Sequence, residues 1–425
     1  MNSSETFRTI YETENIKAEE YSTHRFISRS IMISVYKYAD EDAPLRTLSS
    51  RIISRATSNY DQPYKLTRYL YSLNGARLNA GTYKIGDVQI FGLSLKMLNP
   101  LSGFENNLTK GVELLKEIFL NPLTNNGMFN EKYFNEEKFN QINEINDLIN
   151  DRPRYAINKF IKHMCRNEGF GISNLGEVDE VKKIENKDIC SYYFNNIIQN
   201  KKYIHFAGEF RNNNLDTIVS DFSVISGNYS ETENKLKIKH TKEKHKPIKH
   251  VEEEKIEQTW LFMGYRHNID NKTPLYGALL VFNAIFGKYS SSRLFTILRE
   301  KMGLCYYVAS SIPSNKNILI VSSAIKWKDN EKFIDQVESI RNHFSINKIS
   351  DSEISIAKKL LLSSADSIYD STSSIVNTRI EFLLSNPLLR IEDLKSWISD
   401  CSKDDITKIA RELWLDTTYI LKGNI

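Results

Sequence analysis

The sequence has few cysteines, and none is placed where cysteine chemistry would need it. Its 425 residues include four cysteines, Cys165, Cys190, Cys305 and Cys401, and no two of them form a C-x-x-C pair. A disulfide framework or a zinc knuckle needs grouped cysteines, so both are disfavoured and a reducing compartment is favoured. We therefore expect a cytoplasmic protein without a disulfide framework.

Long apolar runs and an excess of one charge are absent as well. The polar start Met1-Asn-Ser-Ser-Glu-Thr6 carries no apolar signal core, and no apolar run approaches the length of a membrane span. The 57 basic and 53 acidic residues give a formal net charge of +4, too little for a strong field toward nucleic acid. No glycine-rich phosphate loop supports an NTPase. These absences predict a soluble protein with neither a nucleic-acid nor a membrane partner.

The most informative stretch of the chain spans residues 290–310. Three apolar residues recur in it at helical spacing: Leu294, Ile297 and Leu298. Gly303 fits a helix C-cap, with Lys301 in the last turn, where a cation is favoured. From Cys305 onward the residues are mostly β-branched or aromatic, which is typical of a strand. The stretch is therefore predicted to be a helix, a glycine stop and a strand.

This unit would hold Arg299 near the end of its helix and Tyr306 at the start of its strand. The two side chains could then face one site, as a pair of hydrogen-bond donors suited to a developing oxyanion. The alternative is that both are ordinary surface residues near a helix end. On spacing alone the surface interpretation is favoured.

The first half of the chain alternates strand-like and helix-like segments, which predicts an α+β layer. In chain order we expect two strands within residues 1–40, helices over 45–58 and 64–73, strands over 77–83 and 88–97, helices over 104–120, 131–150 and 153–166, a strand over 203–206 and a helix near 213–222.

A charged connection is predicted between the two halves. Residues 229–255 are dense in Lys, Glu and Thr and poor in apolar residues, which is typical of an exposed, extended linker. Three histidines lie in it at intervals of five: His240, His245 and His250. That spacing does not put ligands on one helical face, so a solvated linker is favoured over a metal site.

Beyond the linker the pattern of the first half begins again. We expect a strand from residue 260, a helix over 275–286, the helix-to-strand unit, strands over 318–324 and 417–421, and helices near 329–346, 351–368, 371–386 and 403–413. Gly75, with its preceding helix and following strand, corresponds to Gly303, 228 residues further on. A duplication at this scale predicts two similar domains, over residues 1–228 and 256–425.

The helix-to-strand unit resembles a known signature. The segment L-R-E-K-x-G-L-x-Y at Leu298–Tyr306, after S-R-L-F at Ser292–Phe295, is similar to the C-terminal-domain signature of the pitrilysin and mitochondrial-processing-peptidase family of zinc metallopeptidases. The first half resembles the same family through Tyr71–Thr82. The resemblance implies two duplicated α/β sandwich domains that form half of a clamshell. It also implies that Arg299 and Tyr306 assist a metal site in a different domain or subunit.

The zinc motif of active relatives is missing from the chain. In those relatives the inverted motif H-x-x-E-H lies on a helix and supplies two zinc ligands and a general base. The resemblance places the five positions at Thr47–Arg51, where Ser50 replaces the base and Arg51 would repel a cation. No histidine lies between His24 and His163. We therefore expect no metal in this chain.

One remnant of the metal site is implied by the resemblance. Glu137 and Glu144 are seven residues apart, so they share a helical face, and they match the supporting glutamate and the third zinc ligand of active relatives. Without the histidines a lone carboxylate is a poor zinc site. The favoured interpretation is two solvated glutamates on an asparagine-rich helix.

The resemblance is strongest to bacterial subunits that lack the zinc motif and accompany a zinc-bearing homologue. It implies a non-metal subunit of a heterodimeric zinc metallopeptidase, inactive alone, with zinc expected in the partner. Arg299 and Tyr306 would be its catalytic residues, and its substrates would be peptides, including leader peptides in bacteriocin maturation.

The alternative function is a catalytically inactive scaffold or peptide-binding module of the same fold. A nucleophilic cysteine enzyme is not supported, because Cys305 has no nearby histidine in the sequence and a buried hydrophobe is the default for such a cysteine.

Overall fold

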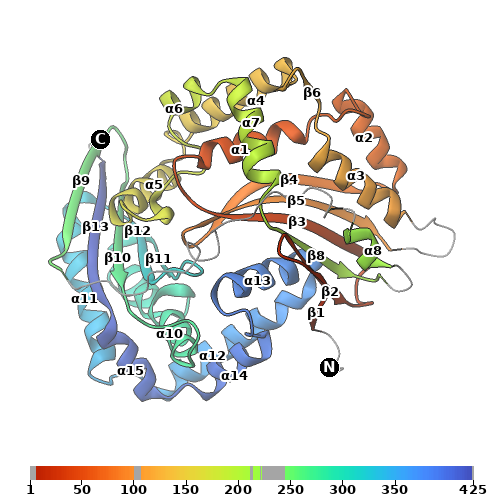
Figure 1. The fold of residues 1–425 in the computed structure, drawn as a ribbon. Coiled ribbons are helices and arrows are strands. Elements are labelled where there is room, and N and C mark those ends of the chain that lie inside the picture. The colour runs from red at the N-terminus through yellow and green to blue at the C-terminus, as the bar shows by residue number, and fades with distance from the viewer. Residues whose placement is uncertain (1–5, 100–106, 211–213, 221, 223–244, 424–425) are drawn as a thin grey trace. The chain divides into compact units, whose positions relative to one another are not determined.

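Two β-sheets carry the fold, and each lies at the centre of a separate compact unit (Figure 1). The structure, a computed structural model, describes residues 6–99, 107–210, 214–220, 222 and 245–423. The first unit comprises Met1–Ile149, Ile172–Leu236 and Tyr369–Arg379, and the second comprises Asn150–Gly171, Lys237–Ile368 and Ile380–Ile425. Helices pack on both sheets, so the predicted α+β class is confirmed.

The first unit holds a six-stranded sheet in the order β1-β2-β8-β3-β5-β4. Its strands are β1 (Phe7–Glu12), β2 (Ile16–Ser22), β3 (Ser28–Tyr38), β4 (Arg77–Ile85), β5 (Val88–Leu98) and β8 (Lys202–Gly208). Neighbouring strands are antiparallel except β2 and β8, which run parallel. A separate two-stranded ladder joins β6 (Thr124–Asn125) and β7 (Met128–Phe129).

The second unit holds a five-stranded sheet in the order β11-β12-β10-β13-β9. Its strands are β9 (Ile248–Glu254), β10 (Thr259–Arg266), β11 (Cys305–Ser311), β12 (Ile318–Ile325) and β13 (Trp414–Gly423). Only β9 and β13 run parallel.

The two sheets repeat one topology. In each, a hairpin forms one edge (β4 with β5, β11 with β12), and the next strand inward (β3, β10) is antiparallel to it. The two strands that follow run parallel to each other (β8 with β2, β13 with β9), and β1 is an addition to the first sheet. The hairpins also follow glycines of positive φ, Gly75 at +71° and Gly303 at +61°. The predicted duplication is confirmed.

The linker prediction is wrong for its last residues. Ile248–Glu254 is the strand β9, which holds in the second sheet the place of β2 in the first. Its sequence is mostly charged because it is an edge strand, and charged side chains protect sheet edges from pairing with other chains. Residues 229–244 lie outside the described part of the chain.

The first forty residues contain three strands where two were expected. The additional strand β1 pairs with β2 in an antiparallel hairpin. Its residues are only partly buried, so the apolar signal of a core strand is missing from its sequence.

Helices cover one face of the first sheet (Figure 1). They are α1 (Ala43–Ile53), α2 (Pro63–Ser72), α3 (Leu108–Leu120), α4 (Glu131–Asp147), α6 (Val178–Lys183), α7 (Asn186–Tyr192), the π-helix η2 (Tyr193–Ile198) and α8 (Leu215–Ser220). The core joins α1 and α3 to β3 and β5 through side chains such as Leu48, Phe119, Ile33 and Leu93. Alternate residues of β3 and β5 point into this core, so the residues between them face the other side of the sheet.

The second unit is built in the same way. Its helices are α5 (Arg152–Met164), η1 (Gly169–Gly171), α10 (Leu275–Asn283), η3 (Ala284–Lys288), η4 (Leu294–Lys301), η5 (Trp327–Asp329), α11 (Asn330–Ser345), α12 (Asp351–Asp366), α14 (Ile391–Asp400) and α15 (Lys403–Glu412). The short η6 (Ser367–Asp370) is divided between the two units. The core joins α10, α11 and α15 to the sheet through Phe282, Phe333, Ile409 and Met263.

A segment from the first half of the sequence covers the other face of the second sheet. Phe160 of α5 stacks on Phe262 of β10, with ring centroids 5.7 Å apart, and Met164 joins the same cluster. A Cβ atom at Gly264 would lie 2.3 Å from Met164 Sδ and 2.7 Å from Phe160 Cζ. A side chain at this position would therefore force Met164 and Phe160 to move where α5 approaches β10.

The first sheet receives a segment from the second half in the same manner. The initial turns of α13 (Thr372–Ser385) belong to the first unit, where Arg379 forms a bidentate ion pair with Glu19 of β2 at 2.7 Å for both contacts. Ser30 Oγ of β3 lies 2.6 Å from Thr372 Oγ1. Two polar contacts thus fix the start of α13 on the sheet.

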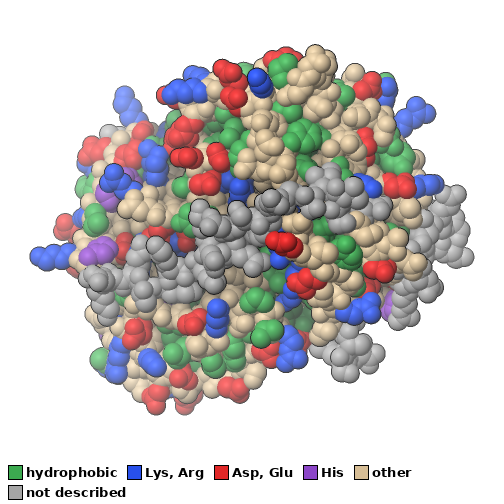
Figure 2. All heavy atoms as spheres, viewed as in Figure 1, with side chains coloured by type: hydrophobic (Ala, Val, Ile, Leu, Met, Phe, Trp, Pro, Cys, Tyr) green, Lys and Arg blue, Asp and Glu red, His purple; other side chains and the backbone are tan. Residues whose placement is uncertain are grey.

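Charges of both signs are interspersed on the molecular face in Figure 2, consistent with a net charge of +4. That face shows no extended field of a single sign. Within the described ranges, no helix is both long and apolar enough to cross a membrane.

Buried charges hold the α5 segment in the second unit. Glu168 accepts from Arg266 Nη2 at 2.7 Å and from Lys316 Nζ at 2.5 Å, and the three side chains are 5–12% exposed. Burial alone would raise the pKa of Glu168, but the positive charges of Lys316 and Arg266 lower it to about 2. The network ties the chain after α5 to strand β10.

Replacing Glu168 with glutamine should destabilise the second unit by about 3–5 kcal/mol, because the buried Lys316 loses this counter-charge and Arg266 keeps only its ion pair with Asp416. The measurement is hydrogen exchange of the β10 amides at neutral pH, with the exposed Glu412→Gln as the control. Equal exchange in the two variants would contradict the role of the network.

The lowered pKa of Glu168 also makes the stability of the second unit depend on pH. The contribution of Glu168, on the order of 3 kcal/mol, is present above its ordinary pKa of 4.5 and is lost as pH falls from 4.5 toward 2. Thermal unfolding below pH 4.5 should therefore depend less on pH in Glu168→Gln than in the unsubstituted protein.

Candidate functional site

The residues at the zinc-motif positions lie on α1 and are engaged within the first unit. Thr47 Oγ1 lies 2.7 Å from Thr82 Oγ1 and donates to the carbonyl oxygen of Asn174 at 2.7 Å. Ser50 Oγ donates to the carbonyl oxygen of Thr47, also at 2.7 Å. Both hydroxyl side chains are buried. These positions therefore hold small neutral side chains where a ligand and a base would be needed.

Two arginines, one on α1 and one just after it, form ion pairs with the carboxylates of Glu144 and Glu137. Arg51 Nη2 lies 2.5 Å from Glu144 Oε2, and Arg55 Nη1 lies 2.5 Å from Glu137 Oε1. Arg55 Nη2 makes a second ion pair with Glu136 at 2.7 Å. Glu137 and Glu144 thus face α1 from one side of α4, as their seven-residue spacing predicted.

The interpretation of two solvated glutamates is wrong for Glu137. This residue is 7% exposed, and the guanidinium on its carboxylate lies 5.4 Å from the ring centroid of Tyr133. Glu144 is more open but is also held by its arginine. The carboxylates are therefore parts of a structural bridge between α1 and α4.

This donor set does not fit zinc. A catalytic zinc site takes three protein ligands, commonly histidine with glutamate, and leaves one position open. Here a guanidinium lies against the carboxylate at the third-ligand position, Glu144, and neutral hydroxyls stand on α1. Among the residues that the structure describes, no group of three His, Cys, Asp or Glu side chains could hold a metal ion.

The predicted helix-to-strand unit is present in the second unit. Its helix is η4, a π-helix that buries Leu294 and Leu298. The backbone N–H of Met302 donates to the Ile297 carbonyl, and Gly303 then turns the chain at a φ of +61° into β11. No neighbouring atom lies within 4 Å of a Cβ built on this glycine. The glycine is therefore favoured by the positive φ of the backbone and not by a lack of space.

A β-bulge at the start of β11 re-aims Tyr306. Cys305 pairs with Ile325 and Tyr307 pairs with Ala324, so Tyr306 is the extra residue between them. Tyr306 is 62% exposed and Tyr307 is 48% exposed. Bulges are common beside functional sites because they redirect a side chain. Two adjacent tyrosines are thus presented on an edge strand.

Arg299 lies exposed in the last turns of η4, and its guanidinium carbon is 4.6 Å from the ring centroid of Phe295. The structure therefore brings Arg299 and Tyr306 to two exposed positions of one unit, on packed elements joined by Gly303. Their catalytic role stays a prediction. Cys305 is buried, as expected from the sequence, and burial raises the pKa of its thiol to about 11.

The sequence contained part of the signal for the α1–α4 bridge. Arg51 was recognised as a residue that would repel a cation, but its pairing with Glu144 was not. Arg55 lies in the turn just after α1, so helical spacing could not have indicated its pairing with Glu137.

The fold is that of a metallopeptidase-like protein of two repeated domains, and ion pairs lie at the positions that the resemblance assigns to the metal. Comparison with known proteins agrees. The model of the peptidase M16 inactive domain matches residues 183–361. The chain is 27% identical over 414 residues to the probable inactive metalloprotease YmfF of Bacillus subtilis (strain 168), across 96% of this chain and 95% of that protein.

Solved structures share the whole fold. A conserved protein from Enterococcus faecalis V583 is similar with a TM-score of 0.88 and 22% identity, over 96% of both chains. The peptidase M16 inactive domain from Pseudomonas fluorescens is similar with a TM-score of 0.81 and 17% identity, over 99% of this chain and 98% of that one. The chain is thus similar to inactive members of the M16 peptidase family, and the predicted resemblance is confirmed.

Removing Arg55 should destabilise the first unit more than removing Arg51. Arg55→Met leaves the nearly buried Glu137 without its cation and should cost about 1–3 kcal/mol. Arg51→Met leaves the more exposed Glu144, which water can solvate, and should cost less than about 1 kcal/mol. Chemical denaturation measures both, and the reverse order of the two costs would contradict this account of burial.

Zinc should not stabilise the protein. A metal bound only by the folded chain raises the unfolding temperature, but here it would have to displace Arg51 from Glu144. Thermal unfolding with and without one equivalent of zinc should give equal midpoints. A rise in the unfolding midpoint that a chelator reverses would contradict this expectation, because it would show that zinc binds the folded chain.

Proposed function

We propose that this chain is the non-metal subunit of a heterodimeric zinc metallopeptidase that processes short or unstructured peptides. The proposed substrates include leader peptides of ribosomally made products such as bacteriocins, and the proposed location is the cytoplasm. The proposal is supported by one contrast. The metal positions of the first unit are taken by ion pairs, whereas Arg299 and Tyr306 of the second unit are exposed.

The proposed division of labour follows from the chemistry of each side chain. The homologous partner would bring zinc, which activates water for attack on a peptide bond. Arg299 and Tyr306 would donate hydrogen bonds to the scissile carbonyl oxygen as it gains negative charge. Arginine suits this role because it stays charged at all physiological pH values.

Positioning on an edge strand also supports the proposal. β11 ends its sheet, so Tyr306 is not covered by a further strand. The bulge fixes the backbone that carries the phenol, and Gly303 fixes the turn between the two donors. Donors set in place before the reaction need no costly reorganisation when charge develops.

The alternative is a scaffold or peptide-binding module with no part in the chemistry. The contact between Arg299 and Phe295 favours it, because a guanidinium stacked on its own helix can have a structural role. Metal analysis of a purified complex separates the two functions. A zinc-bearing homologue in the complex supports the first, and a homodimer or an unrelated enzyme supports the second.

Arg299→Ala should lower the peptidase kcat by about 10²–10³ when this chain is combined with the zinc-bearing family member of the same genome, because an oxyanion donor is lost. Tyr306→Phe should lower kcat in the same direction with little change in KM. Cleavage of quenched fluorescent peptides measures both parameters.

Matched controls lie beside each donor. Lys301→Ala removes an exposed cation two residues from Arg299, and Tyr307→Phe removes the neighbouring exposed phenol. Neither should change kcat. Unchanged activity of Arg299→Ala and Tyr306→Phe, or an equal loss in the controls, would refute the catalytic role.

A further inference from the structure

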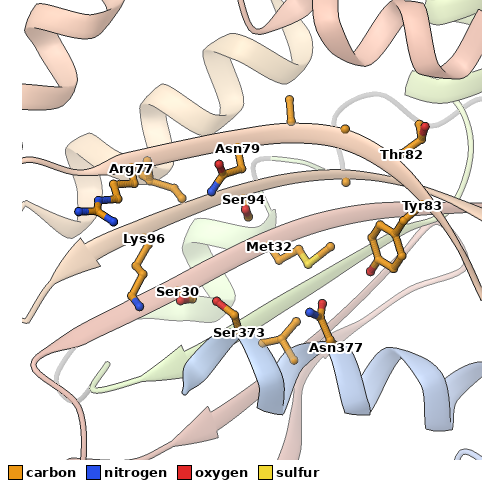
Figure 3. A pocket seen from close by; sticks show the side chains of 15 residues that line it. Ser30, Met32, Arg77, Asn79, Thr82, Tyr83, Ser94, Lys96, Ser373 and Asn377 are labelled. Atoms are coloured by element: carbon orange, nitrogen blue, oxygen red, sulfur yellow. The ribbon is translucent and has the colours of Figure 1, made fainter. Parts of the chain in front are cut away.

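The first unit has a cavity on the sheet face that α1 and α3 leave uncovered. Its volume is about 410 Å³, and its walls come from β3, β4, β5 and the start of α13. Figure 3 shows the side chains that line it. The contacts Ser30–Thr372 and Arg379–Glu19 fix the wall formed by α13, so the cavity is built on supported elements.

Two glycines open the floor of this cavity. Gly81 of β4 and Gly92 of β5 lie directly opposite each other in the antiparallel ladder. A Cβ atom on Gly81 would meet no atom within 4 Å, and Gly81 lines the cavity. Glycine inside a strand weakens it, and it often marks a place where a ligand approaches the backbone. A facing pair of glycines is therefore a feature that favours an occupant.

Two cations stand opposite each other on the same hairpin. Arg77 and Lys96 form a directly facing cross-strand pair, both are exposed, and both line the cavity. Like charges in this position destabilise a hairpin. Neither has an ion-pair partner within the described ranges, and the described lining contains no Asp or Glu. An anion that binds both side chains would relieve their repulsion.

The cations and the large uncharged side chains lie at different ends of the cavity. Lys96 and Ser373 lie toward one end in Figure 3, while Met32 and Tyr83 lie toward the other, together with the polar Thr82 and Asn377. The first end offers hydroxyl and ammonium donors to a carboxylate, and the second offers a surface for an uncharged side chain.

We propose that this cavity binds an acidic segment of a peptide. Arg77 and Lys96 take the carboxylate, the peptide backbone passes over Gly81, and a neighbouring apolar side chain packs on Met32. The choice of a peptide as the ligand rests on the proposed function, whereas the preference for a carboxylate rests on the cavity alone. Guanidinium and ammonium groups make charge-assisted hydrogen bonds to carboxylates, which are the stronger kind.

The test is fluorescence anisotropy with the full chain and three labelled hexapeptide amides or acids. One peptide amide carries two aspartates, its twin carries two asparagines, and a third is the asparagine twin with a free C-terminal carboxylate. The third peptide distinguishes a side-chain carboxylate from a chain terminus as the source of the charge.

Three variants complete the design. Arg77→Gln with Lys96→Gln removes both cations, and Arg68→Gln with Lys187→Gln is the control, because it removes the same charge from exposed residues outside the cavity. Gly81→Val fills the floor without a clash at its Cβ atom and leaves the charge unchanged.

The aspartate peptide should bind the Arg77→Gln/Lys96→Gln variant at least about tenfold more weakly than the unsubstituted chain, as loss of charge-assisted hydrogen bonds requires. Gly81→Val should weaken binding as well, and the control should bind normally. Equal binding of the aspartate and asparagine amides, or an equal loss in the control, would overturn the proposal. Binding of the free acid but not of the aspartate amide would overturn the assignment to an acidic segment.

The outcome can be separated from that of the proposed function. If the reconstituted pair cleaves both amides equally, and Arg77→Gln/Lys96→Gln changes nothing, the cavity proposal fails while the two-subunit function stands. If this chain binds the aspartate peptide selectively but adds no activity to the zinc-bearing protein, the cavity proposal stands while the function fails.

Discussion

The ion pairs between the α1 region and α4 are the contact on which the proposed function of this chain depends. Arg51 and Arg55 place guanidinium groups against Glu144 and Glu137, the two residues that the family resemblance matches to the third zinc ligand and its supporting glutamate. A guanidinium supplies the positive charge that those carboxylates need, so the two helices stay joined without zinc. It supplies no open coordination position and no activated water. The first unit thus has a peptidase-like fold, with arginine–glutamate ion pairs where the resemblance would place a metal.

The duplicated topology shows how the two units have diverged on one plan. Both sheets end in a hairpin that follows a glycine of positive φ. In the second unit the edge strand carries a bulge and the exposed Tyr306. In the first unit the corresponding hairpin carries facing glycines and facing cations over a cavity. The edge hairpin therefore presents the hydrogen-bond donor Tyr306 in the second unit, and in the first unit it lines a cavity with two cations.

The sequence was sufficient to predict features that depend on local spacing. The helix, glycine and strand around Gly303 were readable because their apolar period and their stop residue are local. The duplication could be predicted because Gly75 marks in the first unit the same turn that Gly303 marks in the second. The missing zinc motif was readable because the ligand residues themselves are absent.

Features that depend on strand pairing or on distant partners were not predictable. The charged sequence of β9 predicts a linker, because an edge strand carries few of the apolar residues that indicate a strand. The packing of α5 in the second unit depends on Gly264, which lies about a hundred residues from Phe160 in the sequence and allows a contact that only tertiary structure defines. The cavity depends on the register that sets Gly81 opposite Gly92, and no pattern within one strand fixes that register.

The most direct measurement of the central claim is a titration of this chain into a fixed amount of the zinc-bearing family member of the same genome, with peptide hydrolysis as the readout. We expect little hydrolysis by either protein alone, and a rate that rises with added chain and levels off at one chain per zinc-bearing partner. Full hydrolysis by the zinc-bearing protein alone, unchanged by any amount of this chain, would contradict the claim that the chain supplies half of an active site.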